Sequence, residues 1–157
     1  MDIRQAEPKD IPQILMLTDS VADKHGNNRP DILVKHPYHI TREKLERNML
    51  SNSHFIIVAD DTDRIIGVIL CSMRSYVNDM KFKNAKVLSI EDTCVDPNFR
   101  GNQVGSTLLN YIKKLARENG CLRLESNVWA FNNESKAFFL ANGFKTQRII
   151  MECFINE

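Results

Sequence analysis

Apolar positions in the first third of the chain recur mostly with the spacing of helices. A helix is predicted over 11–22, after a short strand and turn at 3–11. Glycine, asparagine and proline interrupt the pattern over 25–39, which predicts a loop. Thr41 is then placed to cap a second helix, which carries Leu45 on its apolar side.

The middle of the chain changes to apolar, β-branched runs that are typical of strands. The runs "HFIIVAD", 54–60, and "RIIGVILCSM", 64–73, are separated by three polar residues. Such a short polar separation predicts a hairpin. A polar connection over 77–85 leads to a further strand, "KVLSIEDTCV", 86–95.

Helices and strands alternate in the second half. An amphipathic helix is predicted from Val104, with apolar residues on one face and lysine and arginine on the other. A strand over 121–131 follows, and then a short helix that Asn132 or Asn133 can cap. Residues 144–155 are predicted to close the chain as one long strand or a hairpin. This order of elements predicts a mixed α/β (α+β) layer fold.

Composition places this pattern in a single folded domain, residues 1–157. Hydrophobic residues are 43% of the chain and charged residues 26%, enough for a packed core. The net charge of +1 gives no basic footprint for nucleic acid, and no apolar run is long enough to span a bilayer. The charged N-terminus does not resemble a secretory signal, and the four cysteines form no C-x-x-C pair. We expect a cytoplasmic protein with reduced thiols and with neither nucleic-acid nor membrane partners.

The stretch "VDPNFRGNQVGSTLL", 95–109, places glycine-flanked backbone where the predicted helix starts. The first N–H groups of a helix lack intrahelical partners, and the helix dipole adds positive charge there. Gly101 and Gly105 let a ligand approach this backbone closely, and Arg100 can add a fork of donors. The loop therefore predicts a pyrophosphate cradle.

Neither common phosphate-binding loop matches this stretch. The segment "GNQVGST" is one residue short of a P-loop and lacks its lysine, and the dinucleotide fingerprint G-x-G-x-x-G is absent. Taken alone, the G-x-x-x-G pattern is explained equally well by an ordinary tight turn between a strand and a helix.

Two longer stretches carry a more specific signal. They are "IEDTCVDPNFRGNQVGSTLLNYIKKLA" and "LRLESNVWAFNNESKAFFLANGF", and together they resemble the GNAT superfamily of N-acetyltransferases. The family's loop is written Q/R-x-x-G-x-G/A, and Arg100, Gln103 and Gly105 occupy its marked positions. The family's second signature, an asparagine followed by a helix and a Gly-Phe pair, is matched by Asn132 and the later pair at 143–144.

The resemblance, which extends over 86–144, implies a fold and a co-substrate. The implied GNAT fold has a central mixed, mostly antiparallel, twisted sheet of six to seven strands with helices on both faces. The sheet is expected to split in a V shape between the strands at 86–95 and 121–129. Acetyl-CoA is expected to bind in this split, and no metal is expected.

The same resemblance implies which residues bind the co-substrate. The backbone of the 86–95 strand is expected to pair with the pantetheine arm like an added strand, and the following loop to hold the pyrophosphate. The Asn132 side chain is expected to hydrogen-bond the pantetheine. The full expected set is Thr93, Cys94, Val95, Arg100, Gly101, Asn102, Gln103, Val104, Gly105, Ser106, Asn132, Ser135 and Phe139.

Two residues depart from the family pattern. Gln103 stands where the family usually has its first glycine, which is tolerable if the side chain points outward. Phe139 stands where many members place a tyrosine that protonates the departing CoA thiolate, and phenylalanine has no proton to give. Water, another donor such as Ser135, or no side chain at all can serve instead. A CoA-binding module with little turnover is therefore the alternative to an enzyme.

Glu91 and Asp92 are the candidates for the base that takes the proton of the amine acceptor. Strand alternation would put Glu91 on the face of Thr93 and Asp92 on the face of Ile90, unless a β-bulge inverts the pattern. Glu91 is preferred as the base, with a role as a mere anchor for the substrate amine equally open. Asp92 is the second choice, because a buried carboxylate that caps a neighbouring loop explains it better.

The acceptor is not specified by the sequence. A polyamine, an antibiotic, an amino acid or a protein N-terminus all remain open as the small-molecule or peptide amine, and a homodimer is possible because dimers are common in the family. His36 and His39 flank Pro37, so they do not share a helix face and are not expected to bind a metal.

Overall fold

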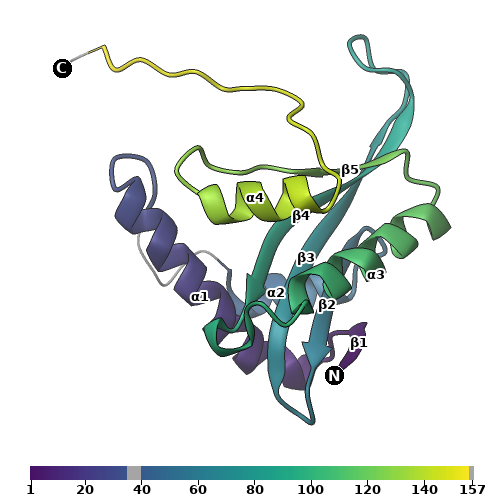
Figure 1. The fold of residues 1–157 in the computed structure, drawn as a ribbon. Helices are drawn as coiled ribbons and strands as arrows, with labels where there is room; N and C mark the ends of the chain where they lie inside the picture. The colour runs from purple at the N-terminus through teal and green to yellow at the C-terminus, as the bar shows by residue number, and fades with distance from the viewer. Residues whose placement is uncertain (35–39, 156–157) are drawn as a thin grey trace. The chain divides into compact units, whose positions relative to one another are not determined.

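A sheet in the order β1-β2-β3-β4-β5 organises the first 127 residues. The computed structural model describes residues 1–34 and 40–155 (Figure 1). The chain divides into two compact units, the second of which begins at Val128, and each unit is described by itself below. The strands are β1 (Asp2–Gln5), β2 (His54–Asp60), β3 (Ile65–Tyr76), β4 (Ala85–Val95) and β5 (Arg123–Ser126). The first four strands run antiparallel to their neighbours, and β4 pairs with β5 in parallel.

Three α-helices and two 3-10 turns complete this first unit. They are η1 (Pro8–Asp10), α1 (Ile11–Asn28), α2 (Arg42–Met49), η2 (Pro97–Phe99) and α3 (Val104–Glu118). Thr41 caps α2 as the sequence predicts, because its hydroxyl accepts a hydrogen bond from the Lys44 amide at 3.2 Å. The predicted 64–73 strand extends to Tyr76, and the hairpin from β2 to β3 is confirmed.

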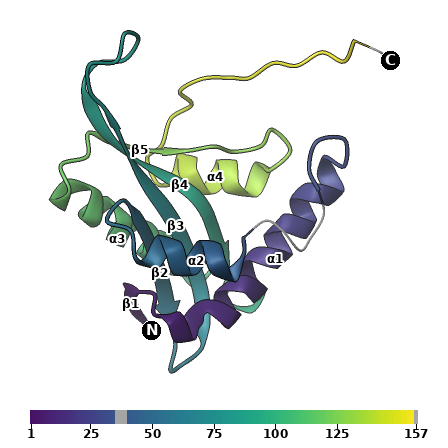
Figure 2. The same cartoon turned by 180° about the vertical axis from the view of Figure 1, so that it is seen from behind.

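Neighbouring residues of β3 point to opposite faces of the sheet, so Gly67 and Val68 show which helix covers which face. Val68 lies in one core cluster with Ile11 of α1 and Leu45 of α2. A methyl group added at Gly67 would instead lie 2.9 Å from Val104 Cγ1 of α3. Helices α1 and α2 therefore cover one face of the sheet and α3 covers the other, as Figure 2 shows from behind.

The second unit, from Val128 onward, contains the helix α4 (Asn133–Ala141). Asn132 caps it, because its side-chain oxygen accepts a hydrogen bond from the Ser135 amide at 3.2 Å. Phe139 is its buried residue, and its ring lies 4.9 Å from that of Phe144 after the chain turns back at Gly143, which has a φ of 88°. The helix predicted from the Asn-Asn pair is confirmed.

Three sequence-based boundaries are wrong. α1 continues to Asn28 through the predicted loop, because Ala22 and Gly26 extend its buried stripe and packing outweighs weak helix propensity. β5 is four residues long, because its ladder with β4 ends at Ser126. Residues 144–155 form no strand, so the described residues hold five strands in place of the expected six to seven.

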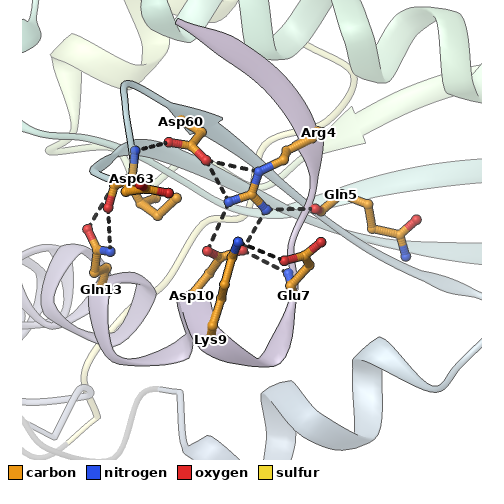
Figure 3. A network of polar contacts seen from close by, with 9 residues as sticks. Arg4, Gln5, Glu7, Lys9, Asp10, Gln13, Asp60 and Asp63 are labelled. Carbon is orange, nitrogen blue, oxygen red and sulfur yellow. Dashed lines mark hydrogen bonds and ion pairs between the residues drawn. The ribbon is translucent and has the colours of Figure 1, made fainter.

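A buried ion network ties β1 to the start of α1 and to the end of β2 (Figure 3). The Arg4 guanidinium donates to both carboxylate oxygens of Asp10, at 2.7 and 3.0 Å, and to Asp60 at 2.7 Å. Asp10 also accepts a hydrogen bond from the Glu7 amide at 2.8 Å. Arg4 lowers the pKa of the Asp10 carboxyl below its ordinary value, although burial acts in the opposite direction. Sequence patterns gave no sign of this network, because Arg4 and Asp60 lie 56 positions apart in the chain.

We predict that Asp10→Asn lowers the free energy of unfolding at pH 7 by about 1.5–3 kcal/mol, because charge-assisted hydrogen bonds to Arg4 are lost. The folded carboxyl has the lower pKa, so its contribution is present above the unfolded value of about 4 and is lost as the pH falls below it. Urea unfolding of both proteins at pH 7 and pH 3 measures this: the difference between them should shrink at pH 3. Lys9→Gln, which removes only the exposed pair with Glu7, is the control and should leave stability unchanged. An equal loss at both pH values would contradict the assignment.

Candidate functional site

Strand β4 loses its partner on one edge halfway along its length. It pairs with β5 only from Val87 to Ile90, while its pairing with β3 continues to Val95. The edge from Glu91 to Val95 therefore carries backbone groups with no strand beside them among residues 1–127. This is the split that the family resemblance predicts between these two strands.

A β-bulge sits where the strands part. Ile90 pairs with Cys71 and Asp92 with Leu70, so Glu91 is the extra residue on β4. Bulges bend a strand and increase its twist, which accounts for the end of the ladder with β5 at this point.

The bulge inverts the alternation of side chains that the sequence suggests. Cross-strand partners share a face, so Asp92 lies on the α1/α2 face together with Ser89 and Cys94. The expectation that Asp92 shares a face with Ile90 is therefore wrong. Asp92 is half-buried, whereas Glu91 is exposed.

The loop after β4 is anchored before it reaches α3. The Asp96 carboxylate accepts a hydrogen bond from the Asn98 amide at 2.9 Å and pairs with Arg64 at 2.8 Å. These two partners lower the pKa of the Asp96 carboxyl below its ordinary value. The Arg64 guanidinium also lies 5.1 Å from the centre of the Phe99 ring. Sequence analysis missed this anchor, because Arg64 comes from the distant β2–β3 hairpin.

Two left-handed residues bring the backbone into α3. Gly101 has a φ of 79° and Gln103, the residue that precedes the helix, a φ of 61°. A glycine adopts such a φ without strain, whereas a residue with a Cβ atom destabilises the fold by about 1 kcal/mol there. This cost explains why the family pattern has a glycine at the position of Gln103. The Gln103 side chain is exposed, which is the condition under which a glutamine can replace the glycine.

Several amides of this loop have no hydrogen-bond acceptor in the part of the chain that the structure describes. They are the N–H groups of Gly101, Gln103, Val104, Gly105 and Ser106. They stand at the positive end of a 15-residue helix, beside left-handed backbone of the kind that forms anion-binding concavities. Arg100 and Asn102 are exposed in the same loop. The arrangement suits a diphosphate group.

The unpaired edge of β4 offers further groups. The Thr93 hydroxyl is buried and has no hydrogen-bond partner among the described residues, which is costly without a ligand or water. Burial raises the pKa of the Cys94 thiol well above its ordinary value, with Asp92 acting in the same direction and Arg100 against it. The neutral thiol is a poor nucleophile, so Cys94 and Val95 can contribute their backbone to a ligand but no thiolate chemistry.

A polar row on the α1/α2 face of the sheet was missed by sequence analysis. His54, Ser72, Ser89 and Glu125 are successive cross-strand partners on β2, β3, β4 and β5. Ser72 and Ser89 are 7% and 4% exposed, and neither hydroxyl makes a hydrogen bond within the described residues. Each serine is isolated in an apolar run, so only the strand register reveals that they lie side by side.

The remaining expected residues lie in the second unit or outside the description. Asn132 and Ser135 form the cap of α4, and Phe139 is packed among aromatic rings. The histidine pair at 36 and 39 lies outside the described residues. Among the residues that are described, no group of three or more histidine, cysteine and acidic side chains is placed to hold a metal ion.

The model of the acetyltransferase (GNAT) family matches residues 18–144, most of the chain. The chain belongs to the GNAT family. No curated protein matches the chain. None of the helices in the described ranges is long and apolar enough to cross a membrane.

Solved structures confirm that the fold is that of GNAT acetyltransferases. A mutant of the BH1408 protein from Bacillus halodurans has a TM-score of 0.94 at 22% identity, covering 99% of both chains. The aminoglycoside N-acetyltransferase AAC(6')-Iy in complex with CoA has a TM-score of 0.71 at 22% identity, covering 98% of this chain and 99% of its own. The aminoglycoside acetyltransferase meta-AAC0020 from an uncultured soil metagenomic sample, in complex with sisomicin, has a TM-score of 0.74 at 15% identity over 99% and 95%.

We predict that Gly67→Ala displaces the start of α3 and with it the loop amides. The added methyl group would lie 2.9 Å from Val104 Cγ1 and 3.1 Å from Leu108 Cδ1, and overpacking of this kind costs about 1–3 kcal/mol. Thermal unfolding and amide NMR shifts over 101–106 should both change. Gly120→Ala, just past the other end of α3, is the control: its methyl group would meet no atom within 4 Å, so it should leave these amide shifts in place, although its φ of 68° makes it cost about 1 kcal/mol of stability as well. Unchanged shifts in the Gly67 variant would show that this contact does not position the loop.

Proposed function

We propose that this protein transfers an acetyl group from acetyl-CoA to a primary amine, and that residues 1–157 act as a single N-acetyltransferase domain. The observation that carries the proposal is the set of unpartnered amides of Gly101 and Gln103–Ser106, in the loop that follows the unpaired edge of β4. One extended ligand with a diphosphate at one end and amide groups along its arm satisfies both sets of backbone groups. Coenzyme A is such a ligand, and the family membership supports the choice.

The residues of the loop and of β4 fit the two halves of this ligand. The amides of Gly101, Gln103 to Ser106 and the exposed Arg100 and Asn102 would hold the diphosphate. The backbone of Thr93, Cys94 and Val95 would pair with the pantetheine amides as an added strand. Asn132, Ser135 and Phe139 are assigned to the pantetheine and its thiol end from the family pattern alone.

Direct transfer is the chemistry that these residues support. Bound acetyl-CoA supplies a thioester, whose carbonyl carbon is open to an amine lone pair. The new C–N bond forms, the C–S bond breaks, and the sulfur leaves as the CoA thiolate. Glu91 or Asp92 takes the proton that the amine must lose. A covalent route through Cys94 is disfavoured, because burial raises the pKa of its thiol.

The acceptor is proposed to be a small-molecule or peptide amine that is cationic and polar. The Asp92 carboxylate lies on the α1/α2 face of the sheet, and so does the polar row that runs through Ser89 and ends at Glu125. Such groups suit an ammonium ion with neighbouring hydroxyl groups better than an apolar amine. Aminoglycosides, the substrates named for two structures of the same fold, therefore belong in any acceptor panel.

A CoA-binding protein with little turnover is the second candidate, and Phe139 favours it. The ring is 7% exposed, packs against Phe138 and Phe144, and offers no proton to a leaving thiolate. Calorimetry with CoA, followed by a free-thiol assay with acetyl-CoA and a panel of polyamines, aminoglycosides, amino acids and peptides, separates the two. Thiol release with any amine supports the enzyme, whereas tight CoA binding without release across the panel supports the binding protein. Absence of CoA binding would overturn both.

We predict that Gly105→Val abolishes CoA binding while the protein stays folded. The branched side chain would stand among the unpartnered amides at the start of α3 and keep the diphosphate away from them. Calorimetric titration with CoA measures the loss. Thr107→Val is the matched control, since it places valine in the same helix at an amide already bonded to the Gln103 carbonyl at 2.9 Å. Equal CoA affinity in the Gly105 variant would contradict the assignment of this loop.

The two carboxylates at the bulge are predicted to differ in the pH dependence of turnover. Replacement of the base by its amide should lower kcat by about 10²-fold or more at low pH, with less effect at high pH where free amine is abundant. CoA affinity should not change. Initial rates of Glu91→Gln and Asp92→Asn over pH 6–10 identify the base. If a carboxylate only anchors the ammonium of the acceptor, its replacement raises KM instead of lowering kcat. If neither profile changes, both residues are excluded from the base role.

A further inference from the structure

Two serines of the polar row, called the serine pair below, are buried without hydrogen-bond partners for their hydroxyl groups. Ser72 of β3 and Ser89 of β4 are 7% and 4% exposed, and the strand register sets them opposite each other. Neither hydroxyl makes a hydrogen bond within the described residues. A buried polar group without a partner costs free energy. Two such groups side by side therefore indicate a binding place for a polar ligand.

Hydrogen-bond donors and a positive charge gather on the β2 and β3 side of the serine pair. His54 of β2 lies opposite Ser72, and its Nδ1 atom is 3.0 Å from the Ser51 hydroxyl oxygen. In the tautomer in which Nδ1 accepts a hydrogen bond from that hydroxyl, Nε2 carries the proton and is a donor. Arg74 lies two residues beyond Ser72 and so on the same face. Its side chain is exposed and forms no ion pair in the ranges 1–34 and 40–155.

Acidic groups lie on the other side of the serine pair, at the opening between β4 and β5. Asp92 shares the α1/α2 face with Ser89, and Glu125 of β5 is the cross-strand partner of Ser89. The Glu125 carboxylate accepts a hydrogen bond from Arg123 Nε at 2.7 Å. Arg123 balances the charge of Glu125, so Glu125 does not repel an anion at the serine pair. The face thus changes from acidic at the opening to donor-rich and basic at β2 and β3.

We propose that the acceptor amine carries an oxyanion, a carboxylate or a phosphate, which binds at the serine pair and Arg74 while the amine lies beside Asp92. The inference rests on the proposed function and names the chemical class of its acceptor. The strand register gives the length of that acceptor. Asp92 is level with Leu70, and Ser72 lies two residues further along β3, which is about 7 Å. An extended chain covers this distance with roughly six bonds between the amine nitrogen and the oxyanion.

An oxyanion fits these groups better than a second ammonium does. Two serine hydroxyls and a guanidinium can donate to both oxygens of a carboxylate, and hydrogen bonds to a charged acceptor are about twice as strong as neutral ones. A polyamine would instead place its second ammonium near Arg74, where like charges repel. Amino acids with a distal amine and aminoalkyl phosphates are therefore favoured over polyamines.

Initial rates of thiol release with three acceptors of equal length test the proposal. The acceptors are 6-aminohexanoate, 4-aminobutyl phosphate and the neutral 6-aminohexanamide. The kcat/KM for at least one anionic acceptor should exceed that for the amide by about tenfold or more, mainly through a lower KM. The better of the two anionic acceptors identifies the oxyanion.

Substitutions on β3 assign this preference to the site. Ser72→Ala and Arg74→Gln should each bring the kcat/KM of the preferred anionic acceptor close to that of the amide. Ser72→Ala should not lower stability in urea, because the hydroxyl that it removes has no partner in the part of the chain that is described. Lys86→Gln is the matched control and should keep the preference. It removes a positive charge next to Val87, the cross-strand partner of Arg74, but on the opposite face of the sheet.

The possible failures of the site and of the proposed function are distinguishable. Equal kcat/KM for all three acceptors overturns the oxyanion site and leaves acetyl transfer intact. A preference for the anionic acceptors that survives both substitutions overturns the assignment to the serine pair and Arg74. No thiol release with any amine, under conditions where CoA binds, overturns acetyl transfer instead. Amide NMR of the CoA-bound protein then decides the site: 6-aminohexanoate or 4-aminobutyl phosphate should shift the signals of 72–74 and 87–89 more than the amide does, and shifts elsewhere or none overturn it.

Discussion

The parting of β4 from β5 is the constraint on which the site depends. Backbone hydrogen bonds in a sheet are normally satisfied from both sides, and here the bulge at Glu91 ends the ladder after four pairs. The groups left on β4 and the open amides of the next loop form a line of unsatisfied backbone, which is interrupted by the hydrogen-bonded turn at 96–100 and by the bonded amide of Asn102. Backbone groups of this kind cost free energy when they are buried without hydrogen-bond partners. They are therefore suited to a ligand that supplies the missing partners.

The rest of the first unit holds this line in place. Arg64 fixes the loop through Asp96 and Phe99, and Gly67 lets the start of α3 lie close against β3. The ion network of Arg4 lies at the turn of the same hairpin, where Asp60 ends β2, and anchors β1 and the start of α1 to β2. The positions of the loop amides thus depend on contacts between segments that are far apart in sequence.

Much of the fold could be predicted from the sequence, because these features depend on local signals. The caps at Thr41 and Asn132, the β2–β3 hairpin and the start of α3 all follow from residue types at fixed spacing, and each is confirmed. The bulge at Glu91 was not predictable, since it is a property of the pairing between two strands. The row of Ser72 and Ser89 was missed for the same reason, because strand register decides which isolated serines become neighbours.

The C-terminal segment was predicted as a strand from its own pattern, but a strand also needs a neighbour. Local preference and tertiary pairing disagree over 145–155, because the pattern of a segment does not specify the strand that would pair with it.

Amide NMR spectra recorded with and without CoA test the central claim most directly. The account predicts that the signals of Glu91–Val95 and of Gly101–Ser106 shift together as CoA is added, and that their hydrogen exchange slows. Saturable binding that leaves both sets of amides unchanged, with shifts confined to other parts of the sheet, would contradict it.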